Sequence, residues 1–349
     1  MLDNLIPSTV TTIGSMPGTS VRAAVALVVD AMASGDGIPH LPELPARGPG
    51  SDLVGRTAGL LAQVVPDLAT ETTPTGWRFA DAPGRESRRA LSWLGEDLDA
   101  WEEALTSYEG VVAVSLAGPW TLAATIELRG GDRAVRDVGA CRDIAGALAH
   151  AAADHVADLR KRLPAAHISL WLDEPALPSV MLGSIATQSG NSRYAAIDES
   201  VVEAALRQVI EAVHASGASA VVHCCGARPP YQLLRRAGGD ALSVDLLLHD
   251  RHDDDAIGDL LESGGLLVAG VLPAIDGPLS GVSDTVALVR DLGHRLGHAP
   301  DAIAGSVLLA PTCGMAGASP DHVTAVLSRL RSVGRGLREE EAKRGEGQG

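Results

Sequence analysis

The sequence predicts a single (β/α)8 barrel of the α/β class, and three observations lead to this prediction. Short apolar runs rich in β-branched residues recur along the chain, and each is followed by a Gly, Pro or polar break and a longer Ala/Leu-rich segment of helical period. Eight such units can be counted, and their strands are apolar almost throughout, as in parallel strands covered on both faces. The length of 349 residues accommodates a barrel, which usually takes about 250 residues.

The units follow one another in a regular order. The first strand, "TVTTIGS", ends in a Gly-Ser turn, the fourth, "HISLWLDEP", stops at a proline, and the fifth, "ASAVVHCCG", breaks at a glycine. The expected strands are 9–15, 37–43, 110–119, 167–175, 218–226, 241–247, 266–273 and 306–314, of which the second is the weakest. Helices are expected at 21–34, 97–108, 132–162, 199–215, 254–263, 283–297 and 319–343, and the region 47–96 is expected to be irregular.

The predicted barrel occupies residues 1–335 as one domain. The remaining residues, 336–349, are charged and lack apolar periodicity, so they are expected to form a disordered tail. No repeat of fixed period and no low-complexity linker divides the chain.

Charge and hydropathy narrow the class of partner. The formal net charge of −16 and a pI near 5.0 argue against nucleic acid or an anionic membrane as partner, because the electrostatic attraction that drives both would be repulsive here. The N-terminus shows no secretory leader, and no apolar run is long enough to span a bilayer. We therefore expect a cytoplasmic protein that acts on a small molecule.

Cysteine and histidine residues mark a candidate metal site. A disulfide between the adjacent Cys224 and Cys225 would need a strained ring, so the pair needs another explanation. His223 and Cys225 lie two apart in a strand and leave the same face, whereas Cys224 points to the other face. Asp245 and Cys313 stand near the ends of the sixth and eighth strands, whose C-terminal ends meet at the mouth of a barrel. Two thiolates, an imidazole and a carboxylate suit tetrahedral Zn²⁺.

Each of these residues also has a purely structural interpretation. A strand cysteine is often a small buried hydrophobe, His223 could be a satisfied core histidine, and Asp245 could cap a βα loop. Their joint occurrence at strand ends favours the metal site. The stretch "HDRHDDD" at 249–255 could suggest a second metal, but a solvated acidic loop explains it better.

Other polar residues also fall at the expected strand ends. Asp173 is followed by a second acid in "DEP", and it could hold an ammonium group, act as an acid or base, or cap a helix. The turn at Gly14 and Ser15 offers backbone N–H groups and a hydroxyl suitable for a carboxylate or phosphate. Glu43 and Trp120 follow the second and third strands, and we count both among the candidate substrate-binding residues.

These motifs together resemble the catalytic domain of cobalamin-independent methionine synthase, in the superfamily shared with uroporphyrinogen decarboxylase. The matching segments run in order across most of the chain: "TTIGSMP" (11–17), "PEL" (42–44) with "SDLVGR" (51–56), "GPWTLA" (118–123), "LDEPAL" (172–177), "HCC" (223–225), "SVD" (243–245) and "PTCG" (311–314). The "DEPAL" string and the H-x-C pair with a late C-G are fairly specific in combination.

The resemblance implies a role for several residues. His223, Cys225 and Cys313 are implied to bind zinc, with Asp245 where the family usually has the longer Glu. The backbone and hydroxyl around Ile13, Gly14 and Ser15 are implied to bind the carboxylate of an amino acid, and Glu43 and Asp173 its ammonium, which also makes these two acids the candidate catalytic residues.

The implied activity is a zinc-dependent S-methyltransferase that converts homocysteine to methionine, with methyltetrahydrofolate or a methylcorrinoid as donor. A second interpretation keeps the zinc chemistry but uses another thiol and a methylcorrinoid protein. A third is a non-catalytic zinc or thiol-binding barrel, which a closed metal site unaffected by thiols would indicate.

Overall fold

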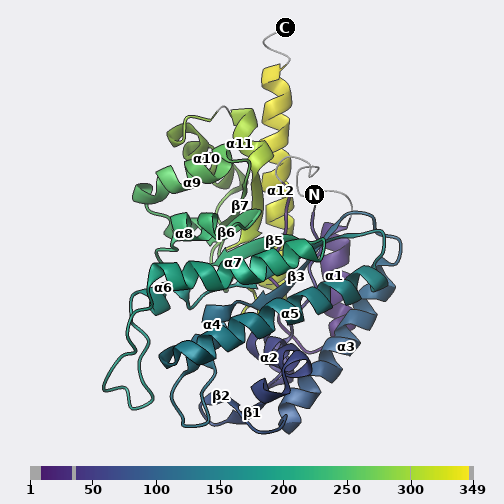
Figure 1. Ribbon diagram of the computed structural model, residues 1–349. Helices are drawn as coiled ribbons and strands as arrows, with labels where there is room; N and C mark the ends of the chain where they lie inside the picture. The colour runs from purple at the N-terminus through teal and green to yellow at the C-terminus, as the bar shows by residue number, and fades with distance from the viewer. Residues whose placement is uncertain (1–8, 34–36, 299, 346–349) are drawn as a thin grey trace.

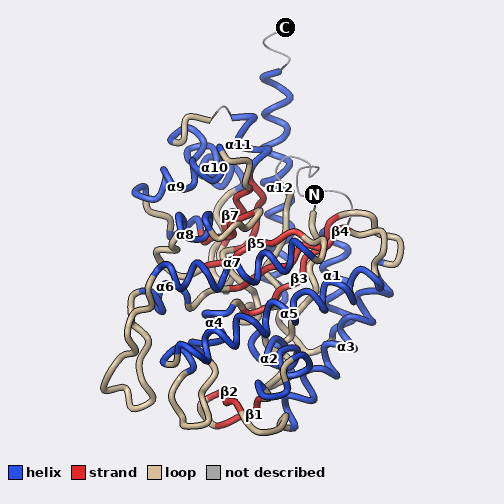
Figure 2. The backbone as a smooth tube through the Cα atoms, in the orientation of Figure 1, coloured by secondary structure: helices blue, strands red, loops and turns tan. Residues whose placement is uncertain are grey.

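A curled sheet of six parallel strands forms the centre of the molecule. The computed structural model describes residues 9–33, 37–298 and 300–345. The strands pair in chain order, β3 to β8: Val111–Ala117, His167–Asp173, Ser219–Cys224, Ala241–Asp245, Leu266–Leu272 and Val307–Pro311. Helical crossovers connect them, so all six carboxyl ends lie at one edge, and Figure 2 shows the strands in red with the helices around them.

The first two expected strands are extended segments joined to the sheet by isolated bridges. Val10 pairs with Leu309 of β8, His40 pairs with Ala113 of β3, and the two segments pair with each other at Ser15 and Glu43. The described strands therefore form a six-stranded half-barrel, and the prediction of eight strands is wrong for these two. Prolines within residues 37–43 lack an N–H donor, which interrupts the ladder there.

Both extended segments nevertheless contribute to the core inside the curled sheet. A separate apolar cluster takes residues from both segments and from all six strands: Ile13, Ile38, Val111, Ala113, Trp171, Val221, Ala241, Val268, Leu308 and Ala310. Side chains alternate between the faces of a strand, so polar residues one pleat further along point to the same interior, at the carboxyl end. This alternation places the candidate site above the inner core.

Helices cover the outer face of the sheet (Figure 1). The long ones are α1 (Val21–Met32), α2 (Leu53–Val64), α3 (Arg85–Leu105), α5 (Val138–Arg162), α7 (Glu199–Ala215), α9 (Asp254–Glu262), α10 (Val282–Arg295) and α12 (Pro320–Gly345), and the short ones are α4 (Pro119–Thr125), α6 (Leu177–Met181), α8 (Tyr231–Arg236) and α11 (Pro300–Ser306). Side chains of Ser20, Asp52, Asp137 and Asp198 accept N–H groups at the starts of α1, α2, α5 and α7. The seven expected long helices are present, and the predicted end of the first, Ser34, lies outside the described residues.

The region 47–96, expected to be irregular, is ordered. It holds α2, a hairpin of β1 (Thr70–Thr73) and β2 (Gly76–Phe79), and the first half of α3. The helical signal was present, because buried Ala90, Leu94, Leu98, Trp101 and Leu105 recur every three or four residues, but charged residues between them obscured it.

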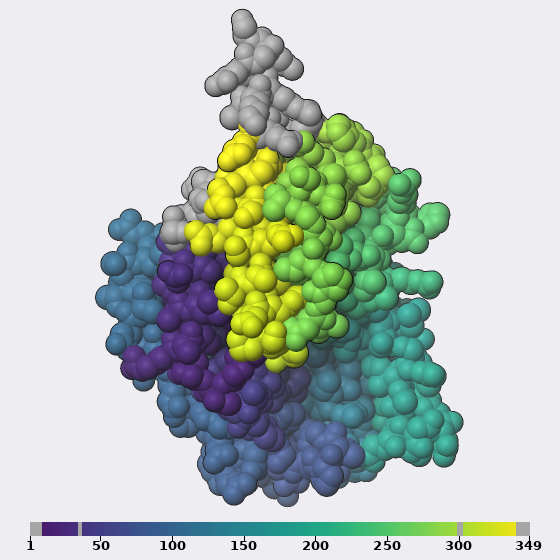
Figure 3. All heavy atoms as spheres, turned by 180° about the vertical axis from the view of Figure 1, so that it is seen from behind, coloured from purple at the N-terminus to yellow at the C-terminus, as the bar shows by residue number. Residues whose placement is uncertain are grey.

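The C-terminal helix α12 packs beside the N-terminal part of the chain. Figure 3 shows α12 in yellow between the purple N-terminal segments and the green helices, and α10 packs against it. The helix continues past residue 335, the predicted domain boundary, and residues 346–349 of the expected tail lie outside the description. Within the described part of the chain, no helix is both long enough and apolar enough to cross a bilayer.

Candidate metal centre

Three side chains converge at the carboxyl edge of the sheet. His223 lies in β5, Cys225 directly follows that strand, and Cys313 follows β8. One ligand atom from each lies within 4.8 Å of the others, and the two sulfurs are 3.1 Å apart. It is the one such group of three found in the described residues. The structure thus brings together three of the four predicted metal ligands.

A hydroxyl orients the imidazole of His223. The Nδ1 atom of His223 lies 2.9 Å from Oγ of Ser243 on the neighbouring strand β6, and both side chains are buried. The Nε2 atom is buried without a hydrogen-bond partner. With Nδ1–H donating to the Ser243 hydroxyl, Nε2 would be the free ligand atom, as in metal-binding histidines whose other ring nitrogen makes a hydrogen bond.

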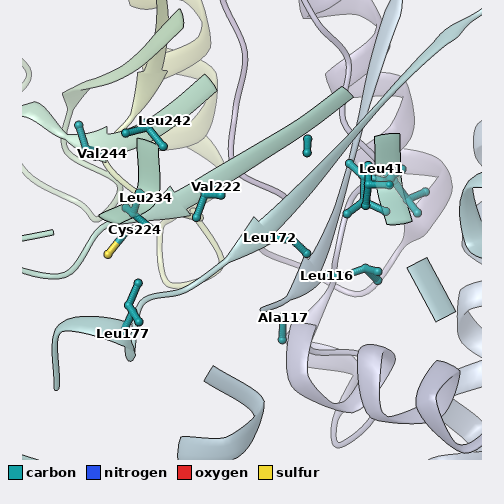
Figure 4. Close-up of a cluster of buried hydrophobic side chains, with 14 of the residues drawn as sticks. Leu41, Leu116, Ala117, Leu172, Leu177, Val222, Cys224, Leu234, Leu242 and Val244 are labelled. Atoms are coloured by element: carbon teal, nitrogen blue, oxygen red, sulfur yellow. The ribbon is translucent and has the colours of Figure 1, made fainter. Parts of the chain in front are cut away.

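Cys224 belongs to the apolar layer between sheet and helices. Its side chain is fully buried in the main hydrophobic cluster, and Figure 4 shows it among apolar side chains that include Leu177 and Leu234. Burial raises the pKa of its thiol to about 12. The alternation of β5 therefore separates a structural cysteine, Cys224, from Cys225, as predicted from the spacing.

The turn after Cys313 packs against the first extended segment. A Cβ added at Gly314 would lie 2.8 Å from Cβ of Ser15, so glycine permits the close approach. The N–H of Met315 donates to the carbonyl of Ser15 at 2.7 Å. The cysteine from the end of the sheet and the predicted carboxylate-binding turn are thereby neighbours.

Asp245 is not part of the convergent group. Its Oδ1 accepts the N–H of Leu247 at 2.9 Å, which closes the turn after β6. This is the loop-capping arrangement that the sequence left open as an alternative.

The two acids of "DEP" have different roles in the fold. Glu174 accepts the N–H groups of Trp120 and Thr121 at 2.9 and 2.7 Å and so caps α4. A Cβ at Gly118 would lie 2.4 Å from the Glu174 carboxyl carbon, so glycine is needed there. Asp173 pairs in register with His223 and has a buried Oδ1 without a partner. The helix cap that was considered for Asp173 is thus made by its neighbour.

Glu43 is a second buried acid with an unpartnered oxygen. Ser15 Oγ donates to Glu43 Oε2 at 3.1 Å, and Oε1 is buried without a partner. A Cβ at Gly14 would lie 3.4 Å from the Glu43 carboxyl carbon, so the Gly14 and Ser15 turn and this acid face each other.

Two other predicted substrate-binding residues lie elsewhere. The Ile13 side chain belongs to the inner apolar cluster, so only its backbone could contribute to a site. Trp120 is buried in the helical layer, where its Nε1 donates to the carbonyl of Val202 in α7 at 3.1 Å. The structure does not bring the indole of Trp120 to the metal group.

Burial and mutual charge shift the protonation of the acids. Burial raises the pKa of Glu43 to about 7, opposed by the charge of Arg56 and the Ser15 hydrogen bond. Burial raises the pKa of Asp173 to about 8, opposed by His223 and reinforced by Glu43 and Cys313. Both acids therefore gain or lose a proton near neutral pH when the site is empty of cations.

The two thiols titrate as a pair. The hydrogen bond from Cys225 holds the pKa of Cys313 well below its usual value, against the effect of burial, and the same contact raises the pKa of Cys225. Burial lowers the pKa of His223, but its interactions with Cys313 and Asp173 outweigh this and raise the pKa overall. A thiolate next to a thiol and an imidazole is a set of soft ligands ready for a cation.

Sequence reasoning missed Ser243 as part of this site. The signal was available, because Ser243 stands two residues before Asp245 in the same strand and so shares its inward face.

The loop 249–255 forms no metal group among the described residues; His249 instead lies 2.7 Å from Asp254, which also pairs with Arg295.

Comparison with known proteins supports the fold. No family model and no curated protein sequence matches the chain. A solved structure of a B12-independent methionine synthase from Shewanella sp. W3-18-1, in complex with selenomethionine, is similar with a TM-score of 0.63 and 14% identity, over 97% of this chain and 100% of that one. A glycoside hydrolase family 20 β-N-acetylglucosaminidase gives 0.51 and 13%, over 95% of this chain and 70% of that one. At identities this low the similarity establishes the fold only, and the chemistry has to be inferred from the residues of the site.

Proposed function

We propose that the chain is a zinc-dependent S-methyltransferase that methylates homocysteine to form methionine, with methyltetrahydrofolate or a methylcorrinoid protein as donor. The observation that carries the proposal is the convergence of one histidine and two cysteines within 4.8 Å beside two buried acids with unpartnered oxygens. A purely structural cluster would be expected to satisfy these polar atoms within the protein.

The residues present fit zinc. The unpartnered Nε2 of His223 is the atom that a metal ligand would offer, and one nitrogen with two sulfurs is a donor set that zinc prefers. Three protein ligands leave a fourth position for a substrate sulfur. Asp245, whose Oδ1 accepts the N–H of Leu247, remains a proposed fourth ligand that the substrate sulfur would displace.

The chemistry requires a thiol to react as a thiolate. Zinc, when bound, would supply the positive charge that favours the thiolate at neutral pH. His223, Cys225 and Cys313 would hold the ion, and Ser243, by accepting the Nδ1–H, would keep the histidine in the required tautomer.

The neighbouring acids suit the amino-acid end of the substrate. The free oxygens of Asp173 and Glu43 would accept hydrogen bonds from an ammonium group, and both acids must ionise to do so. The backbone N–H at Gly14 and the Ser15 hydroxyl would bind the carboxylate, and the hydroxyl would have to turn from Glu43 Oε2 to do so. Holding both ends of the substrate would fix its sulfur for in-line attack on the methyl group. The selenomethionine bound to the similar structure supports an acceptor of this type.

The test is methionine formation by the zinc-loaded protein. Homocysteine would be offered with 5-methyltetrahydrofolate, its triglutamate or methylcobalamin in parallel, with Cys225→Ser as inactive variant and Cys224→Ser as matched control. Product with any donor in the wild type and the control, but not in Cys225→Ser, would support the proposal. Absence of product with all donors despite bound zinc would reject homocysteine methylation with these donors and favour another thiol or a non-catalytic site.

A further inference from the structure

A buried cluster of three charges lies next to the Glu43 segment. Asp97 of α3 is fully buried, and its Oδ2 accepts from Arg47 at 2.5 Å and from Arg56 at 2.6 Å. Both arginine side chains are also buried, with exposed fractions of 8% and 3%. Arg47 ends the short helix Pro45–Arg47, and Arg56 lies in α2. These are the first two helical elements that follow Glu43 in the chain.

Hydrogen bonds from Arg56 of α2 and from Ser51, which lies just before α2, hold the backbone on either side of Glu43. The Nη2 of Arg56 that pairs with Asp97 also donates to the carbonyl of Pro42 at 3.2 Å. Ser51 donates to the carbonyl of Leu44 at 2.8 Å. The backbone of Glu43 is itself bonded to the first segment, because its N–H donates to the carbonyl of Gly14 at 3.1 Å and its carbonyl accepts the N–H of Met16 at 2.8 Å. The side-chain contacts add to these backbone bonds by holding the carbonyls of the residues before and after Glu43.

The charges of the cluster do not cancel. Two arginines and one aspartate leave one positive charge in a buried region, and Glu43 is the buried acid closest in sequence to it. A buried charge is costly unless it is paired, and the charge of Arg56 favours an ionised Glu43, although burial outweighs this effect and raises the pKa of Glu43 to about 7. The charged groups that act on Glu43 are Arg56 and Asp52 of the α2 region, Asp97 of α3, and Asp173 across the site.

We propose that Asp97, although it lies outside the site on α3, is a positioning residue for Glu43, acting through Arg56 and the carbonyl of Pro42. Without Asp97 the guanidinium of Arg56 would have no fixed place from which to hold that carbonyl. This inference rests on the proposed function, because it assigns Glu43 to the ammonium group of the substrate. It adds a residue that touches neither the metal ligands nor the substrate.

The test compares Asp97→Asn with Glu127→Gln. Glu127 is a matched control because it is also fully buried and pairs with an arginine, Arg78, at 2.9 Å. Homocysteine binding to the zinc-loaded proteins would be measured by calorimetry between pH 6 and pH 9, together with zinc content. We expect Asp97→Asn to weaken binding about tenfold, the effect of losing one hydrogen bond to a charged group, with zinc content unchanged.

The pH dependence separates positioning from a general loss of structure. The charge of Asp97 raises the pKa of Glu43, so its removal should move the acid limb of the binding profile to lower pH. Glu127→Gln should bind homocysteine with the affinity and pH profile of the wild type. If Asp97→Asn does not fold, Arg56→Lys keeps the charge but loses the planar guanidinium whose Nη2 contacts both Pro42 and Asp97, and should also weaken binding.

The outcomes are distinct. Wild-type affinity and profile in Asp97→Asn, or in Arg56→Lys where Asp97→Asn does not fold, would overturn the positioning role. An equal loss of binding in Glu127→Gln would also overturn it, since any buried ion pair would then have the same effect. A wild type that binds zinc but no homocysteine would instead reject the proposed function.

Discussion

Replacing Ser243 by alanine tests the geometry of the metal site most directly. The hydroxyl of Ser243 lies 2.9 Å from Nδ1 of His223, and both groups are buried, so no water can take its place without rearrangement. The substitution removes the contact that leaves Nε2 free and leaves Nδ1 buried without a partner. The imidazole can then rotate or change tautomer, and either change moves the ligand atom.

The expected loss is about 10- to 100-fold in zinc affinity, the range found when the hydrogen-bond partner of a metal ligand is removed. This corresponds to about 1 to 3 kcal/mol of binding free energy. Zinc affinity would be measured by competition with a chromophoric chelator. The absorption bands of a Co²⁺-substituted protein would show whether both thiolates still bind.

Ser169→Ala is the matched control. Ser169 is a buried hydroxyl on the neighbouring strand β4, and it accepts the Nε1 of Trp171 at 3.2 Å. The control should cost stability, because it leaves a buried indole N–H unpaired, without changing zinc affinity. Zinc affinity in Ser243→Ala equal to that of the wild type would refute the assignment of His223 Nε2 as a metal ligand oriented by Ser243.

Three further predictions concern the cysteines and the two acids. Cys225→Ser and Cys313→Ser should each lose most bound zinc, whereas Cys224→Ser should keep it. Cys224→Ser should instead lose about 1 to 3 kcal/mol of stability, because it places a hydroxyl in the apolar core. Equal zinc content in all three variants would show that Cys225 and Cys313 are not zinc ligands. Asp173→Asn should weaken homocysteine binding about tenfold with zinc retained, and calorimetry showing unchanged affinity would contradict its role. Because the pKa of Glu43 is raised from 4.5 to about 7, the folded state binds more protons than the unfolded state between these values, so ionisation of Glu43 lowers stability as the pH rises. In urea unfolding of the substrate-free protein, the wild type should lose on the order of 3 kcal/mol of unfolding free energy between pH 5 and pH 8, and Glu43→Gln should not show this loss. The same dependence of unfolding free energy on pH in both proteins would contradict the prediction.

The strand ends were the part of the site most open to prediction. The two-residue period of a strand is local, so it separates Cys225 from Cys224 and gives His223 the same face as Cys225 before any tertiary structure is known. The parallel order of strands then brings Cys313 to the same edge, and the structure confirms this convergence of three residues.

Loop conformations were not open to prediction in the same way. Asp245 caps the turn that follows its strand, and Trp120 turns its indole toward α7, although both stand at strand ends in the sequence. The direction of each side chain depends on partners supplied by distant segments, such as the carbonyl of Val202 for Trp120. Trp120 lies beyond β3, in α4, and Asp245 is the last residue of β6 with its side chain bonded into the following turn, so the alternation along a strand does not decide the contacts of these two side chains.

The sequence by itself determined the βα alternation, the long helices and the face on which each strand residue lies, because periodicity and turn residues act over a few neighbouring positions. Only the tertiary structure decided that two expected strands are bridged segments, that Glu174 caps α4 while Asp173 faces His223, and that Asp97 holds the Glu43 segment through Arg56. These features depend on contacts between residues far apart in the sequence, such as Arg56 with Asp97 at a separation of 41 and Thr121 with Glu174 at 53. Such contacts form only when the chain closes on itself, and they are set by packing and burial that no local pattern records.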